Sequence, residues 1–180
     1  MTGAIDTVTT ELGQPWLLCN IAGIGGMVHT HDMSLRDWER TISVNLTGTF
    51  LMTRACIPLL LESGGSIVNI ASVAGIKGQA YSAAYSASKG GVALFTRALA
   101  VEYAMQGLRV NALAPGGIDT AMTETFQFPE GASKVLLSRI MPFRAMGQPE
   151  DCAALIAFLG SDEARYISGA VIPIDAALTA

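Results

Sequence analysis

Three side chains in the middle of the chain have the types and the spacing of an acid/base site. Tyr85 and Lys89 are four residues apart, so on a helix they would share one face with their Cβ atoms about 5–6 Å apart. A phenol has an ordinary pKa of about 10, and a positive charge held beside it lowers that pKa. Ser72 ends an apolar run thirteen residues before Tyr85 and could hold a substrate oxygen. The trio indicates general acid/base catalysis by tyrosine near neutral pH.

Other chemistry fits these residues less well. A Tyr-x-x-x-Lys pair taken alone is more often a surface pair than a catalytic one. Ser86 and Lys89 also form Ser-x-x-Lys, the acylation motif of penicillin-recognising enzymes, but its partners Ser-Asp-Asn and Lys-Thr-Gly are absent, as is Gly-x-Ser-x-Gly. His29 and His31 lack a third ligand nearby, and we interpret them as loop residues. The sequence therefore disfavours a hydrolase and predicts no metal site.

The elements that must position these side chains alternate along the chain. Hydrophobic residues make up 51% of the sequence and charged ones 14%, as suits strands buried on both faces of a parallel sheet. The predicted strands are Trp16–Ile21, Ser66–Ala71, Leu108–Ala114 and Ala170–Ile174, and the predicted helices are Ala4–Leu12, Leu35–Glu62, Tyr81–Met105 and Pro149–Gly160. This alternation predicts an α/β fold with a mainly parallel sheet and flanking helices.

Ligands of such sheets bind beyond the carboxyl ends of the strands. Gly23, Ser72 and the 115–120 loop all follow predicted strands, so we expect them at one edge of the sheet. The segment from Ile118 to about Arg144 has little pattern and is interpreted as a mobile cover over a site. Its apolar residues hint at an apolar substrate: Met122, Phe126, Phe128, Met141 and Phe143.

Composition excludes several classes of partner. The formal net charge is −4 and the chain has no basic run, which argues against nucleic acid. We find neither an apolar segment of about 18 residues nor the pattern of a signal peptide, and we expect a cytoplasmic chain that does not bind membranes. The three cysteines, Cys19, Cys56 and Cys152, lie far apart in apolar sequence and are predicted to be free thiols.

Five motifs, in this order and spacing, resemble those of the short-chain dehydrogenase/reductase family. They are CNIAG at 19–23, SVNLTG at 43–48, NIAS at 69–72, YSASK at 85–89 and NALAPGGIDT at 111–120. The resemblance runs from about Leu12 to Asp175. It implies a Rossmann-like fold and reversible hydride transfer between NAD or NADP and a secondary alcohol or ketone. Which of the two cofactors is used stays undecided.

The resemblance also implies roles for individual residues. Tyr85 would exchange a proton with the substrate oxygen, Ser72 would hydrogen-bond that oxygen, and Lys89 would lower the tyrosine pKa and hold the ribose hydroxyls of the cofactor. Asn45 would sit at a helix distortion and help a proton relay through water. The implied cofactor-binding residues are Asn20, Ala22, Gly23, Tyr85, Lys89, Pro115, Gly116, Ile118 and Thr120. Ile21 departs from the usual asparagine, and no role is carried onto it.

The glycine-rich turn Thr-Gly-x-x-x-Gly-x-Gly, which holds the cofactor pyrophosphate in the family, is absent here. We therefore expect residues 1–180 to form a single partial Rossmann-like domain, truncated at its N-terminus and lacking the first βαβαβ part. Its phosphate binding should be weak, and strand 16–21 should be an unprotected sheet edge. Two hypotheses stay open: an oxidoreductase, or an inactive remnant that associates with other subunits. The two long helices commonly form subunit interfaces in the family, which implies a homodimer or homotetramer.

Overall fold

A four-stranded parallel sheet forms the centre of the protein. The computed structural model describes residues 2–124 and 126–180. The strands are β1 (Leu17–Asn20), β2 (Ser66–Ile70), β3 (Arg109–Pro115) and β4 (Val171–Ile174), in the spatial order β1-β2-β3-β4 with every pair parallel. The predicted α/β, Rossmann-like fold is confirmed.

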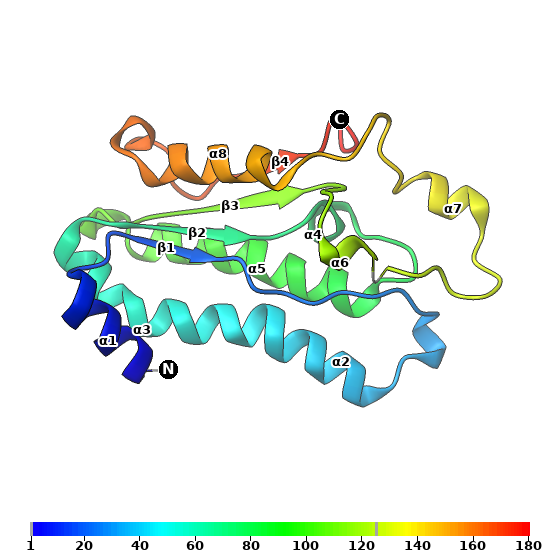
Figure 1. Ribbon diagram of the computed structural model, residues 1–180, viewed down its shortest axis with the longest axis horizontal. Coiled ribbons are helices and arrows are strands. Elements are labelled where there is room, and N and C mark those ends of the chain that lie inside the picture. The colour runs from blue at the N-terminus through cyan, green and yellow to red at the C-terminus, as the bar shows by residue number, and fades with distance from the viewer. Residues whose placement is uncertain (1, 125) are drawn as a thin grey trace.

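Helices cover both faces of this sheet (Figure 1). α3 (Gly48–Ser63) and α5 (Ala83–Glu102) lie on one face, and α8 (Pro149–Gly160) lies on the other. Leu60, Ile67 and Val110 are fully buried on the α3/α5 side, whereas Val68, Leu113 and Leu159 are fully buried on the α8 side. The two central strands, β2 and β3, therefore bury side chains on both faces, which explains their continuous apolar runs. α1 (Thr2–Leu12) packs against this core through Ile5.

The expected helix Leu35–Glu62 is three consecutive helical segments. α2 (Leu35–Ile42) begins at the N-cap Ser34, whose Oγ accepts a 3.1 Å hydrogen bond from the backbone N–H of Asp37. A π-helical turn at Ser43–Thr47 follows, and α3 continues directly from it to Ser63. A π-helical turn widens the ladder by one residue, and such turns are frequent at functional sites. Here the turn carries Asn45.

This continuous stretch also corrects the expectation that the chain has no apolar segment long enough for a membrane span. Leu35–Ser63 contains an 18-residue window that is apolar enough to cross a membrane, judged by length and composition alone. Thr49, Thr53 and Leu60 on this stretch are buried in the domain. Its inner face is therefore part of the protein core, while the outer face stays apolar and uncovered.

The shorter elements lie around the carboxyl ends of the strands. α4 (Val73–Lys77) occupies what the sequence indicated to be a loop, and the expected cover contains α6 (Ala121–Glu124) and α7 (Lys134–Ser138). α5 begins at Ala83 rather than Tyr81, because Tyr81 has a left-handed φ of 65°. Its backbone is held there by Val28, whose N–H donates to the Tyr81 carbonyl at 2.8 Å.

A buried polar chain connects the sheet to both long helices. The Asn20 amide donates to Thr53 Oγ1 at 3.0 Å and to Asn69 Oδ1 at 2.8 Å. The Asn69 amide in turn donates to Thr96 Oγ1 at 2.9 Å. Unpaired polar groups in this position would cost free energy, so the chain fixes β1 and β2 relative to α3 and α5.

Contact between α4 and α5 depends on one glycine. A Cβ on Gly75 would lie 2.5 Å from the carbonyl carbon of Lys89 and 2.6 Å from the nitrogen of Gly90. Both atoms belong to the backbone of α5, so neither can move as a side chain would. The small residue at 75 thus allows α5 to approach the end of β2 closely enough to bring Lys89 there.

We expect Gly75→Ala to lower the free energy of unfolding by about 2 kcal/mol or more, because overpacking against backbone forces two helices apart. Urea denaturation measures this change. Gly90→Ala is the matched control, since its Cβ would meet the Gly75 carbonyl oxygen at a more tolerable 3.3 Å. Equal losses in the two variants would contradict the packing argument.

Candidate active site

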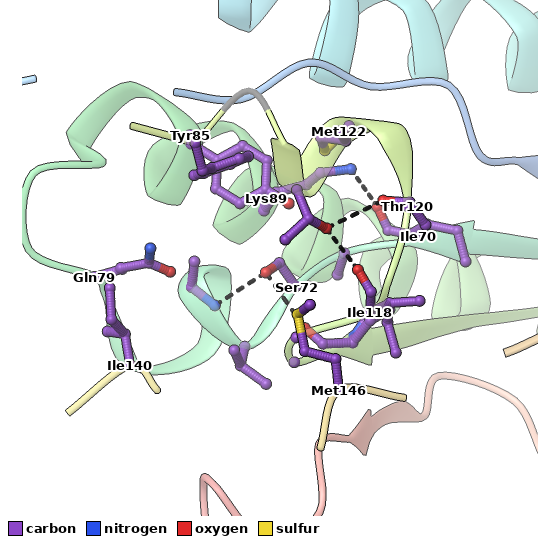
Figure 2. A pocket seen from close by; sticks show the side chains of 18 of the residues that line it. Ile70, Ser72, Gln79, Tyr85, Lys89, Ile118, Thr120, Met122, Ile140 and Met146 are labelled. Atoms are coloured by element: carbon purple, nitrogen blue, oxygen red, sulfur yellow. Dashed lines mark hydrogen bonds between the residues drawn. The ribbon is translucent and has the colours of Figure 1, made fainter. Parts of the chain in front are cut away.

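A cavity of about 810 Å³ opens at the carboxyl ends of β2 and β3 (Figure 2). Ser72, at the start of α4, and Tyr85 and Lys89, both on α5, all line it. The loop after β3 lines it as well, through Pro115, Gly116, Ile118 and Thr120. The structure therefore brings together the trio that the sequence singled out and most of the implied cofactor loop.

Ser72 is held in place by the start of α4. It is the N-cap of that helix, and its Oγ accepts a 3.2 Å hydrogen bond from the N–H of Ala74. Its hydroxyl donates at 3.5 Å to the carbonyl of Pro115, which is a long and weak contact. The donor of Ser72 can thus turn to a substrate oxygen at little cost.

Tyr85 lies in the first turn of α5, and its side chain faces Ser72. Burial raises the pKa of its phenol above the ordinary value, and a hydrogen bond with Ser72 lowers it by a smaller amount. The pKa of Tyr85 is therefore raised overall, whereas from the sequence we expected Lys89 to lower it. The loss of water around the phenolate outweighs the other effects. The ring also meets Phe126 edge-on, with centroids 5.8 Å apart. Tyr85 is therefore a neutral proton donor at neutral pH.

Lys89 is only 3% exposed although it carries a charged group. Its Nζ donates to the carbonyl of Ile70, at the end of β2, at 2.7 Å, and it lies 5.9 Å from the centroid of the Tyr85 ring. Burial lowers the pKa of Lys89 to about 8. One neutral carbonyl offsets this desolvation only in part, which leaves ammonium hydrogens available for a ligand.

Asn45 does not line the cavity but orders one of its walls. Its Oδ1 accepts from the N–H of Ile24 at 2.8 Å, and its Nδ2 donates to the carbonyl of Ile24 at 2.8 Å and to Ser88 Oγ at 2.9 Å. The amide thus holds the loop after β1 against α5. A Cβ on Gly23 would lie 3.3 Å from Asn45 Oδ1 and 3.4 Å from Lys89 Nζ, so this loop passes directly over the lysine.

The loop after β3 is fixed at both ends. The N–H of Gly116 donates to the carbonyl of Ile174 at 3.1 Å, and Gly147 pairs with Gly117 and Asp119 through hydrogen bonds of 3.0 and 2.9 Å. Ile118, between these points, forms an isolated parallel bridge with Gly147. The loop is therefore a firm wall on one side of Ser72 and Tyr85.

Two implied cofactor residues lie elsewhere. Neither Asn20 nor Ala22 is among the described lining residues, and the Asn20 amide is engaged in the buried chain with Thr53 and Asn69. Ile21, the residue directly after β1, does line the cavity and is 58% exposed. The family resemblance implied Asn20 as a cofactor contact; in the structure its side-chain amide points to Thr53 and Asn69.

The predicted apolar cover lies over the cavity in part. Met122, Phe126, Phe128 and Met141 line it, whereas Phe143 is 78% exposed and is not among the described lining residues. Sequence reasoning did not assign several residues to the cavity lining: Met27, Lys77, Gln79, Ile140, Met146, Cys152 and Leu178. For Lys77 a signal existed, since a lysine five residues after Ser72 follows the same strand end.

The remaining sequence expectations concern thiols and metals. Cys19, Cys56 and Cys152 are free, as predicted. Among the residues whose side chains are described, no group of three His, Cys, Asp or Glu side chains could hold a metal ion. His29 stacks on His31 and meets the Tyr81 ring edge-on, and its Nε2 lies 2.9 Å from the carbonyl of Glu130.

A family model described as enoyl-(acyl carrier protein) reductase matches residues 1–179. A 3-oxoacyl-(acyl-carrier-protein) reductase of Thermotoga maritima is 43% identical over 175 residues, covering 97% of this chain and 70% of that protein. Glucose 1-dehydrogenase 2 of Bacillus subtilis is 38% identical over 178 residues, covering 97% of this chain and 68% of that protein. The chain belongs to the short-chain dehydrogenase/reductase family of oxidoreductases.

A solved structure shares the fold across the chain. It is 4-hydroxyisoleucine dehydrogenase complexed with NADH and succinate, with a TM-score of 0.83 and 32% identity, covering 98% of this chain and 73% of that one. The neighbour's bound NADH and the family membership support a nicotinamide cofactor for this fold. They leave open the choice between NAD and NADP.

The lowered pKa of Lys89 predicts a pH dependence of stability. Between pH 8 and pH 10.5 the unfolded chain still binds a proton that the native lysine has released, so the free energy of unfolding rises with pH through this group. We expect the stability of the wild type relative to Lys89→Met to increase by about 1 kcal/mol per pH unit from pH 8 to pH 10. Urea titrations of both proteins at each pH measure this difference. A difference that is flat, or that falls with pH, would contradict the shifted pKa.

Proposed function

We propose that this chain catalyses reversible hydride transfer between NAD(P) and a secondary alcohol or ketone. The observation that carries this proposal is the convergence of Ser72, Tyr85 and Lys89 on one cavity, beside the 115–120 loop. A hydroxyl, a neutral phenol and an ammonium in that order are suited to moving a proton to or from a substrate oxygen. The family membership supports the same reaction type.

The residues around Lys89 fit a nicotinamide cofactor. The Lys89 ammonium has donors beyond the one it gives to Ile70, and they are suited to ribose hydroxyls. Gly23 passes close to Lys89 without a side chain, so a ligand can approach there. Ile118 and Thr120 would contact the nicotinamide end from the loop after β3. When bound, the cofactor supplies or accepts the hydride.

The chain's own residues handle the proton. In the direction of reduction, the Tyr85 hydroxyl donates its proton to the carbonyl oxygen while the Ser72 hydroxyl hydrogen-bonds that oxygen. In the direction of oxidation, Tyr85 takes the proton of the alcohol and must first be deprotonated. Burial opposes the phenolate by raising the pKa of Tyr85, and the hydrogen bond with Ser72 favours it by a smaller amount. Asn45 acts here by holding the 23–25 loop over Lys89.

The walls of the cavity favour an apolar substrate close to the reacting carbonyl. Its apolar lining residues include Met27, Met122, Phe126, Ile140 and Met146. A ligand that replaces water on these walls gains free energy in proportion to the apolar area it covers. We therefore expect the reacting carbon to carry an aliphatic substituent.

The outer faces of α3 and α5 favour a homodimer or homotetramer. Phe50 on α3 and Leu94 and Val101 on α5 are large apolar residues left exposed in the single chain, as is Met105 after α5. Apolar patches of this kind mark protein–protein contacts. Association through these faces would cover the apolar window of Leu35–Ser63.

We expect Tyr85→Phe to reduce the rate of ketone reduction by at least about a hundredfold, because it removes the proton donor without changing the ring. Steady-state kinetics with NADH and NADPH measure the loss, and circular dichroism checks the fold. Tyr166→Phe is the matched control, since Tyr166 is fully exposed and outside the cavity. Full activity in Tyr85→Phe would overturn the mechanism.

Direct titration of NADH and NADPH into the folded chain, followed by calorimetry, tests the cofactor site. We expect micromolar binding that Lys89→Met weakens at least about tenfold, since a charged hydrogen bond to the ribose is lost. Lys134→Met removes an exposed lysine outside the cavity and should bind as the wild type does. A folded chain that binds neither cofactor up to millimolar concentration would favour the inactive, associating remnant.

A further inference from the structure

The charges around the cavity differ in sign from the charge of the chain. The protein has a formal net charge of −4. Yet the charged residues among the described lining of the large cavity are Lys77 and Lys89, and no described lining residue is Asp or Glu. A cavity lined by one sign of charge concentrates ligands of the opposite sign.

A second cavity of about 260 Å³ adjoins the first and extends this pattern. It shares Lys77, Gly78 and Ile140 with the large cavity and adds the guanidinium-bearing side chain of Arg139. Figure 2 shows Gln79 and Ile140 on the opposite side of Ser72 from Ile118 and Thr120. The cationic end therefore lies away from the loop proposed to contact the nicotinamide, which separates Lys77 and Arg139 from the cofactor side.

Neither cation is neutralised by the protein. Lys77 Nζ donates to two backbone carbonyls, that of Leu178 at 2.8 Å and that of Arg139 at 3.5 Å. These contacts orient the ammonium but bring no negative charge. The ion pair found within the described residues joins His31 to Asp32, and neither Lys77 nor Arg139 has a carboxylate within 4 Å there.

Asp175, on the C-terminal tail, already forms hydrogen bonds within that tail. Asp175 Oδ1 accepts from the N–H of Ala177 at 3.1 Å, and its Oδ2 accepts from the Thr179 hydroxyl at 2.6 Å. Asp175 thus serves the turn that places Leu178 against the cavity. Both carboxylate oxygens have partners other than Lys77.

We propose that the substrate is a keto acid, or the matching hydroxy acid, whose anionic group binds at Lys77 and Arg139 while its carbonyl lies at Ser72 and Tyr85. This substrate class rests on the proposed oxidoreductase function. Ser72 and Lys77 lie at the two ends of α4, and five residues of helix span about 8 Å. An apolar spacer of several atoms would therefore separate the carbonyl from the anion, in keeping with the mostly apolar lining of the cavity.

Binding measurements test this charge preference without requiring turnover. The probes are 6-oxoheptanoate and its methyl ester, titrated calorimetrically into the full chain in the Tyr85→Phe background, where no product forms. We expect the acid to bind about fivefold more tightly than the ester, since Lys77 and Arg139 are exposed and a pair of exposed opposite charges is worth up to about 1 kcal/mol. Raising the salt concentration should narrow this preference.

Variants separate the charge from the fold. Lys77→Met should remove most of the acid-to-ester preference, Arg139→Gln should remove a smaller part, and Lys77→Arg should keep most of it. Lys134→Met and Arg165→Gln, which remove exposed cations outside both cavities, should leave it unchanged. If Lys77 only holds the tail through Leu178, Lys77→Met will weaken acid and ester equally, and that result would overturn the proposal.

Two failures can be distinguished. Equal affinity for acid and ester would overturn the keto acid assignment, whatever the enzyme reduces. So would the absence of acid binding up to 10 mM, a concentration that corresponds to a binding free energy on the order of 3 kcal/mol. Preferential binding of the acid without reduction of either probe by the wild type, with NADH or NADPH, supports the anion site and counts against the proposed oxidoreductase function.

Discussion

The burial of one ammonium group organises the site. Lys89 Nζ is held on the carbonyl of Ile70 at the end of β2 and is almost entirely removed from water. A charge in such a place is costly, and the fold retains it only because α5 is brought close to the strand end. That approach requires Gly75, whose missing Cβ admits the backbone of α5. The packing of two helices and the electrostatics of the site are therefore one constraint.

The same constraint explains why the tyrosine pKa moves upward. Tyr85 and Lys89 share a helix face, but the ammonium turns to the strand carbonyl and lies 5.9 Å from the ring centroid. Desolvation of the phenol then outweighs the stabilisation of its anion. A proton donor with this balance is suited to the reduction direction. In the oxidation direction Tyr85 must first lose its proton, and a positive charge or a water molecule brought near the phenol by a bound ligand would favour this deprotonation.

Sequence alone predicted much of this structure because strongly apolar strands and capped helices are local signals. The predicted helix Pro149–Gly160 is confirmed residue for residue, and all four strands lie where their apolar runs predicted. Asn20 shows the limit. The family resemblance implied a cofactor contact there, and the structure adds that the Asn20 amide binds Thr53 and Asn69. Those partners lie 33 and 49 residues away, beyond what local pattern can indicate.

Lys77 was missed for a related reason, and its position shows what a short helix adds to a site. The five residues of α4 carry no pattern of their own, and their helical form depends on the Ser72 cap and on packing against α5. Once formed, α4 places a hydroxyl at one end and an ammonium at the other. Under the proposed substrate assignment, the same short element would carry both the proton-handling end and the anion-binding end of the site.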